Sequence, residues 1–201
     1  MKILGLTGQS GAGKGVVASL LKEHGIPAVD ADAVYHELLI PPSPCLDELR
    51  AEFSDAILNA DGTLNRPALS ALVFAPTDEG KARLRRLNEI THRYVIEQTL
   101  AMLEEYEKRG CRAAVIDAPL LIEAGLHRKC DHVVAVLADR EIRIARLLER
   151  DRLSIEQISA RLDAQKDASF YIEHADSLVY NNGTIDELKA SVSALLAEVL
   201  G

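Results

Sequence analysis

The stretch GLTGQSGAGKGV, residues 5–16, decides the fold class of this chain. It matches the phosphate-binding pattern G-x-x-x-x-G-K-[ST] as far as the lysine. The glycine-rich part of this stretch follows the apolar run Lys2–Leu6, which predicts a buried strand. It precedes a helical pattern that Gly25 ends. Between a strand and a helix, backbone N–H groups can surround a phosphate. The predicted phosphate-binding loop consists of Gly8, Gln9, Ser10, Gly11, Ala12, Gly13, Lys14, Gly15 and Val16.

One position of this loop departs from the pattern. Gly15 stands where a Ser or Thr hydroxyl normally holds Mg²⁺. We expect phosphate binding to persist, because the backbone and the Lys14 ammonium group supply it, and Mg²⁺ usually keeps several waters. Because of this departure, the sequence leaves open whether Asp117 or Asp32 holds the metal ion, in either case through a water molecule. A Gly-rich turn beside an ordinary surface lysine is the alternative interpretation.

Strand-like and helix-like stretches alternate along most of the chain. The further short apolar runs, each a predicted strand followed by a helical pattern, are 26–29, 111–117, 131–137 and 177–180. Capping boxes at 154–157 and 184–187 begin two of the helices. A long helical pattern at about 78–108 belongs to a helical insertion at roughly 46–110. The alternation predicts an α/β fold, a three-layer sandwich with a five-stranded parallel sheet.

Two acidic positions lie where predicted strands end. Asp32 follows the second strand, and Asp117 ends the third. Ligands of parallel sheets bind beyond the carboxyl ends of the strands, so either carboxylate could assist a metal through water. Asp32 could also accept a proton from a substrate hydroxyl. The alternative for both, and for the neighbouring Asp30, is capping of a helix or strand end.

Arginines are concentrated late in the chain. Residues 140–161 contain six Arg and no Lys. Arg143, Arg146 and Arg150 are spaced so that one helix face carries all of them. Planar guanidinium groups suit phosphate oxygens, so this face could close over a γ-phosphate and stabilise charge during transfer. A solvated helix face with local ion pairs is the alternative.

Composition excludes several classes of function. The chain has 201 residues, a net charge of −8, 4% aromatic residues and no Trp, which argues against a nucleic-acid-binding surface. It contains no apolar stretch of about 18 residues, so we expect no membrane span. The first residues run directly into the glycine loop, so we expect no signal peptide. The three cysteines show no metal or disulfide spacing, which favours the reducing cytoplasm.

Several longer motifs occur together and in order between Met1 and about Gly183. They are GLTGQSGAGK, VDADAVYHELL, ILNADGTLNRPALSALVF, DAPLLIEAGL, DHVVAVLADREIRIARLLERD, ARLDAQ and LVYNNG. In these motifs the chain resembles the dephospho-coenzyme A kinase family. The resemblance implies transfer of the γ-phosphate of ATP to the ribose 3′-hydroxyl of dephospho-CoA, with Mg²⁺, in the last step of coenzyme A biosynthesis. It also implies one P-loop kinase domain over 1–201, a substrate-binding helical insertion at about 46–110 and a lid at about 139–166.

The resemblance further implies roles for single residues. Asp32, the second Asp of DAD, is expected to orient or deprotonate the 3′-hydroxyl. Lys14 is expected to act on the ATP phosphates, together with the lid arginines Arg146 and Arg150. The resemblance assigns substrate contacts to Arg66, Leu120 and Glu123, and it places Asn182 in the turn on the adenine side. For these four residues, packing or capping is the alternative.

Other functions fit the same loop. Another small-molecule kinase of this architecture, acting on a nucleoside or nucleotide, is the first alternative. A nucleotide-dependent switch without a small-molecule acceptor is a second, although it would need no helical insertion. Gly15 raises a third, a degenerate protein that binds nucleotide without turnover. The sequence leaves open the oligomeric state, the choice between ATP, GTP and CTP, and the resting position of the lid.

Overall fold

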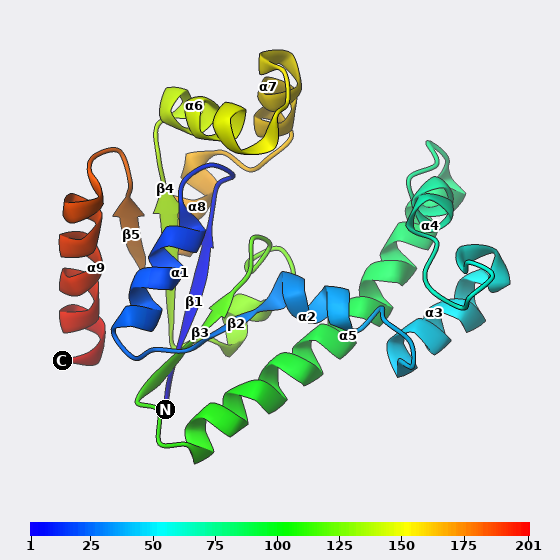
Figure 1. Ribbon diagram of the computed structural model, residues 1–201, viewed down its shortest axis with the longest axis horizontal. Coiled ribbons are helices and arrows are strands. Elements are labelled where there is room, and N and C mark those ends of the chain that lie inside the picture. Colours follow the sequence, from blue (N-terminus) through cyan, green and yellow to red (C-terminus); the bar gives the residue numbers. More distant parts are fainter. The chain divides into compact units, whose positions relative to one another are not determined.

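The computed structural model describes all residues from Met1 to Gly201 (Figure 1). Their contacts divide the chain into two compact units. The first, here called the sheet unit, contains Met1–Val29 and Leu103–Gly201, and the second, the helical unit, contains Asp30–Met102. No helix combines the length and the apolar character that crossing a membrane requires.

The sheet has five strands in the order β2-β3-β1-β4-β5. Their bounds are β1 Lys2–Gly8, β2 Ala28–Asp30, β3 Ala113–Asp117, β4 His132–Leu137 and β5 Ser177–Tyr180. β1 pairs in parallel with both β3 and β4, and β4 pairs in parallel with β5. The strands predicted from apolar runs are therefore all present, and parallel pairing brings their carboxyl ends to one edge of the sheet.

Helices cover both faces of the sheet. The sheet unit contains α1 Lys14–Glu23, η2 Leu126–Lys129, α6 Arg140–Asp151, α7 Ile155–Asp163, α8 Ala168–His174 and α9 Ile185–Leu200. Successive strand residues point to opposite faces, so Val134 and Val136 of β4 join the core beneath α1 and α9. Ala135 and Leu137 instead pack against α8 on the other face (Figure 1). The predicted three-layer α/β sandwich is confirmed.

The helical unit is built around the long helix α5. Its elements are α2 Ala31–Glu37, α3 Pro44–Phe53, η1 Asp55–Ile57, α4 Arg66–Val73 and most of α5, Asp78–Lys108. The bounds of α5 match the predicted pattern at 78–108. Leu49, Ile57 and Ile90, from different elements, are all buried in one apolar core.

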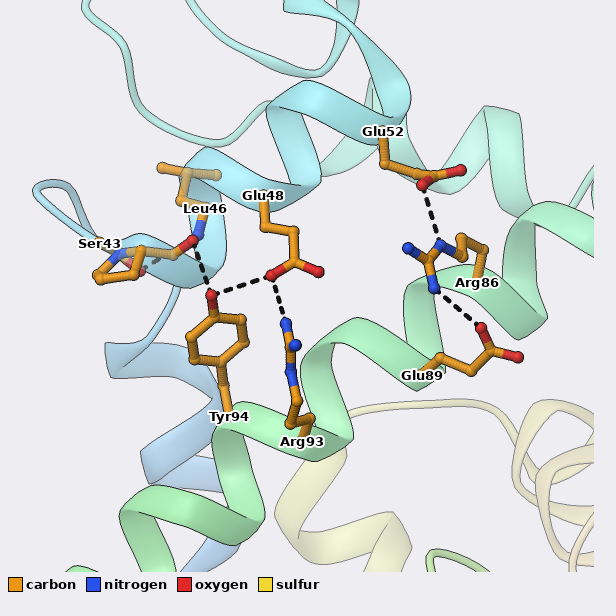
Figure 2. Close-up of polar contacts among 9 residues, drawn as sticks. Ser43, Leu46, Glu48, Glu52, Arg86, Glu89, Arg93 and Tyr94 are labelled. Atoms are coloured by element: carbon orange, nitrogen blue, oxygen red, sulfur yellow. Dashed lines mark hydrogen bonds and ion pairs between the residues drawn. The ribbon is translucent and has the colours of Figure 1, made fainter.

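Polar contacts join α3 to α5 at the edge of this core. Glu48 accepts hydrogen bonds from the Arg93 guanidinium group and, at 3.0 Å, from the Tyr94 hydroxyl (Figure 2). One turn further along α3, Glu52 accepts from Arg86 at 2.9 Å. The ion pairs among these contacts are largely exposed to solvent, so they add little to stability.

Candidate active site

The glycine loop connects β1 directly to α1. Gly11 and Gly13 adopt φ angles of 79° and 96°, which side chains rarely tolerate. Gly13 is the N-cap of α1, and no side chain caps this end of the helix. The backbone amides of Gly11, Gly13, Lys14 and Gly15 donate no hydrogen bond within the protein. Unpaired amides at a helix N-terminus form a binding site for an anion.

Arginines of α6 hold the carbonyl groups of this loop. Arg143 is 5% exposed and donates from Nε to the Ser10 carbonyl oxygen at 2.9 Å. Burial lowers the pKa of its guanidinium group. Arg146 is half-buried and donates from Nη1 to the carbonyl oxygens of Gly11 and Ala12, both at 3.4 Å. The guanidinium groups of Arg143 and Arg146 thus contact the loop itself.

Asn181, which follows β5, holds the loop from another side. It is 7% exposed and donates from Nδ2 to the Ala12 carbonyl oxygen at 2.8 Å. A planar trans peptide points its C=O and the next N–H in opposite directions. Because Arg143 and Asn181 hold the carbonyl groups of Ser10 and Ala12, the amides of Gly11 and Gly13 point to the opposite side of the loop. The contacts therefore direct these unpaired amides to one side of the loop, here called the cradle.

The Lys14 ammonium group forms an ion pair with the Asp117 carboxylate. The two side chains are 20% and 11% exposed. Asp117 ends β3, next to Leu6 of β1 in the sheet register, so the topology brings it to the loop. The structure thus joins two predicted site residues that are 103 positions apart. A triphosphate in the cradle would compete with Asp117 for the lysine.

The surroundings of the loop suit Mg²⁺ only in part. Gly15 has no hydroxyl, and a Cβ added there would meet nothing within 4 Å. No group of three or more His, Cys, Asp or Glu residues is arranged to hold a metal. Asp117, one of the predicted metal residues, lies at the loop through its ion pair with Lys14. These donors fit a Mg²⁺ ion bound mainly by phosphate oxygens and water.

Arg150 lies further along α6 and is exposed. It donates from Nε and Nη2 to the Asp151 carboxylate, at 2.5 and 2.9 Å. Arg161 of α7 donates to the same carboxylate at 2.8 Å. These hydrogen bonds, led by that from Arg150, lower the pKa of Asp151. In contrast to Arg146, the Arg150 side chain makes no hydrogen bond to the loop.

The sequence motifs predicted Asn182 as a site residue but not its neighbour Asn181. Asn182 is exposed and accepts a hydrogen bond from the Asp139 amide, at 2.8 Å, just before α6 begins. Asn181 contacts the loop instead. Gln165 was also missed, although it hydrogen-bonds Ser10. Both missed residues belong to motifs noted above, LVYNNG and ARLDAQ, so the motifs were a signal for them.

Leu120 and Glu123 lie in the turns after β3, in the sheet unit. The Leu120 side chain is 60% exposed, and Glu123 is also exposed. The Ala124 amide donates to the Leu120 carbonyl oxygen at 2.8 Å, which shapes this turn. The Leu120 side chain is therefore not packed into the core.

The other predicted site residues belong to the helical unit. Asp30 caps α2 by accepting from the amides of Asp32 and Ala33 at 2.9 and 3.0 Å. The Asp32 carboxylate is exposed and makes no hydrogen bond or ion pair. Arg66, at the start of α4, places Nη2 3.0 Å from Nδ1 of His36. Capping thus explains Asp30 but leaves Asp32 available.

Comparisons with known proteins identify the family. The model of the family Dephospho-CoA kinase matches residues 2–187. A dephospho-CoA kinase from Corynebacterium glutamicum is 41% identical over 197 residues, which are 98% of this chain and 96% of that protein. The crystal structure of TT1252 from Thermus thermophilus matches with a TM-score of 0.81 and 31% identity, covering 100% of this chain and 98% of the other.

A more distant structure agrees in fold. The dephospho-CoA kinase from Campylobacter jejuni matches with a TM-score of 0.71 at 23% identity, covering 99% of this chain and 98% of that one. The family match extends over nearly the whole chain, and the C. glutamicum relative is alike in length. The resemblance noted in the sequence motifs is confirmed: the chain belongs to the dephospho-CoA kinase family, whose members are kinases that use ATP.

Proposed function

We propose that this protein transfers the γ-phosphate of ATP to the ribose 3′-hydroxyl of dephospho-CoA, the final step of coenzyme A biosynthesis. The observation that carries the proposal is the loop of unpaired amides beside Lys14, in a chain whose family match covers residues 2–187. The amides and the ammonium group bind the β- and γ-phosphates. Asn182 lies on the adenine side. Residues 139–166 act as the lid, and the insertion at about 46–110 binds the acceptor.

Two arginines neutralise charge on the transferred group. The contacts of Arg146 with loop carbonyl oxygens are long, at 3.4 Å, and a phosphate oxygen is a stronger acceptor than a carbonyl. Arg150 reaches the γ-phosphate by leaving Asp151, and an ion pair of such an exposed arginine holds it only weakly. Both guanidinium groups stabilise the charge that develops on the equatorial oxygens during transfer.

Asp32 acts on the acceptor. Its carboxylate is exposed and unpaired, because Asp30 already caps α2. It orients the 3′-hydroxyl in line with the γ-phosphate and accepts its proton. Arg66 binds an anionic part of dephospho-CoA, Leu120 packs against an apolar part, and Glu123 accepts a hydrogen bond.

Mg²⁺ accompanies the nucleotide. When bound, the ion would supply positive charge that offsets part of the charge of the phosphates. Asp117 would hold a water of this ion, with Asp32 as the other candidate, because Gly15 offers no hydroxyl. The cysteines of the chain are all free thiols, and we place the enzyme in the reducing cytoplasm.

The test is a direct assay of the acceptor. Purified protein is incubated with Mg·ATP and, separately, dephospho-CoA, uridine, AMP or shikimate, and ADP and the phosphorylated product are quantified by mass spectrometry. We expect CoA from dephospho-CoA and no product from the others. Preference for another acceptor would support a different small-molecule kinase. Slow ATP hydrolysis that no acceptor alters would support a switch, and ATP binding without turnover would support a degenerate protein.

A further inference from the structure

Gln165 follows the end of α7 and reaches the phosphate loop. Its Nε2 donates to Oγ of Ser10 at 2.9 Å, and its Oε1 accepts from the Ser10 amide at 3.2 Å. Nη2 of Arg143 donates to the same Oε1 at 3.4 Å. The Ser10 amide and the guanidinium group are donors only, so the oxygen of the Gln165 amide must face them.

All polar groups of Ser10 are therefore held by distant residues. Gln165 contacts its N–H and hydroxyl, and Arg143 contacts its carbonyl oxygen. These contacts fix both peptide units that flank Ser10. The second unit carries the amide of Gly11, which has no partner within the protein. Gly11 has a positive φ and no Cβ, so without outside contacts this peptide could rotate freely.

The geometry points to Gln165 as a positioning residue for ATP: it holds Ser10 so that the Gly11 amide stays directed at the phosphates. A primary amide suits this task because it offers a donor and an acceptor on adjacent atoms. The inference rests on the proposed use of ATP. It adds that the segment after α7 maintains the cradle, although Gln165 is 155 residues away from Ser10 in the chain.

The test measures nucleotide affinity by calorimetry in Gln165→Met, which keeps length and apolar contacts but removes both hydrogen bonds to Ser10 and the longer one from Arg143. One neutral hydrogen bond changes an equilibrium by about 5-fold, so the loss of the two bonds to Ser10 should weaken ATP and ADP binding about 30-fold. Adenosine, which lacks phosphates, should bind as in the unaltered protein. In steady state, the KM for ATP should rise with a smaller change in kcat.

Two further variants make the test specific. Ser10→Ala removes only Oγ and should weaken ATP binding about 5-fold. In the double variant the cost of Gln165→Met should be smaller than in the unaltered protein, because the two residues share a bond. Ser193→Met, which also replaces a neutral polar residue with Met but at an exposed position of α9, is the control and should leave affinity and thermal unfolding unchanged.

Clear outcomes would overturn the inference. They are an ATP affinity of Gln165→Met equal to that of the unaltered protein, an equal loss for ATP and adenosine, or strictly additive effects with Ser10→Ala. Should the Met variant unfold, the single Ser10→Ala variant decides by the same ATP and adenosine comparison. If the unaltered protein binds ATP but makes no CoA, the proposed acceptor is wrong, while these binding measurements still decide the role of Gln165.

Discussion

The side-chain amide of Asn181 occupies the space that a side chain on Gly13 would need. A Cβ built on Gly13 would lie 2.2 Å from Nδ2 of Asn181, the atom that donates to the Ala12 carbonyl oxygen. Gly13 also has a φ of +96°. The glycine is thus required both by the backbone and by the residue that holds the loop.

Gly13→Ala should therefore disrupt the cradle. The strained backbone alone costs about 1–3 kcal/mol, and Asn181 must also move. We expect ATP binding, measured by calorimetry, to fall at least about 10-fold, in line with 1.4 kcal/mol per factor of ten. Gly15→Ala is the matched control, because a Cβ there meets nothing within 4 Å. Equal ATP affinities for the two variants would contradict this account of the loop.

Gly15→Ser should restore the hydroxyl that the pattern lacks. The open space at this position accepts the side chain, and the hydroxyl can then bind Mg²⁺ directly. We expect the Mg²⁺ concentration for half-maximal turnover to fall about 10-fold, the lower end of the range for changes in metal-site partners. Gly15→Ala serves as control, since it adds bulk without oxygen. An unchanged Mg²⁺ requirement in the Ser variant would show that the ion does not approach this residue.

Asp30 and Asp32 should respond differently to loss of charge. Asp32→Asn should reduce kcat about 10²- to 10⁴-fold, the usual contribution of a general base, while ATP affinity stays unchanged. Asp30→Asn keeps an oxygen that can cap α2, so its turnover and unfolding temperature should change little. Rapid-quench kinetics and thermal unfolding measure both effects. Near-normal turnover of Asp32→Asn would remove this residue from the mechanism.

Arg150 and Arg161 share one partner but not one role. Both donate to Asp151 from largely exposed side chains, and each leaves the other as a partner of this carboxylate, so replacing either with Ala should change thermal stability only slightly. Arg150→Ala should also lower kcat about 10²-fold, as expected when one donor to a developing charge is removed. Arg161→Ala should leave kcat unchanged. A similar kcat for the two variants would mean that Arg150 does not reach the reacting phosphate.

The thiols of Cys45, which is buried, and Cys130, which is half-buried, should react slowly in the folded protein. Burial raises the pKa of Cys45 to about 11 and that of Cys130 to about 12, with smaller contributions from nearby carboxylates. An unfolded cysteine has a pKa of about 8.5, so at pH 8 the folded thiols are at least about 100-fold less ionised. Iodoacetamide labelling of both residues, followed by mass spectrometry, should be slow until urea is added.

The same shifts predict a dependence of stability on alkaline pH. The folded thiols keep their protons above the pH at which the unfolded thiols lose theirs. Unfolding therefore releases protons, and the free energy of unfolding should fall as the pH rises above about 8.5. Urea denaturation of the Cys130→Ala variant at pH 8 and pH 10 checks this, because the variant should lose part of the decrease. An identical decrease would assign it to other groups.

Sequence alone determined the elements whose causes are local. The strands of the sheet, the bounds of α5 and the capping boxes at Ser154 and Thr184 follow from periodicity and from contacts between residues three or four positions apart. The glycine loop was equally visible, since its pattern is contiguous. Family motifs added the reaction, which no local rule supplies.

The tertiary structure decided which side chains hold the loop. Neighbouring residues after a strand point in different directions, so spacing could not distinguish Asn181, on the Ala12 carbonyl, from Asn182, near α6. Helical spacing grouped Arg146 with Arg150, but Arg146 hydrogen-bonds the loop, whereas Arg150 hydrogen-bonds Asp151. The hydrogen bonds from Arg143, Arg146 and Asn181 to the loop join residues more than 130 positions apart, so they exist only once the sheet has brought the segments together.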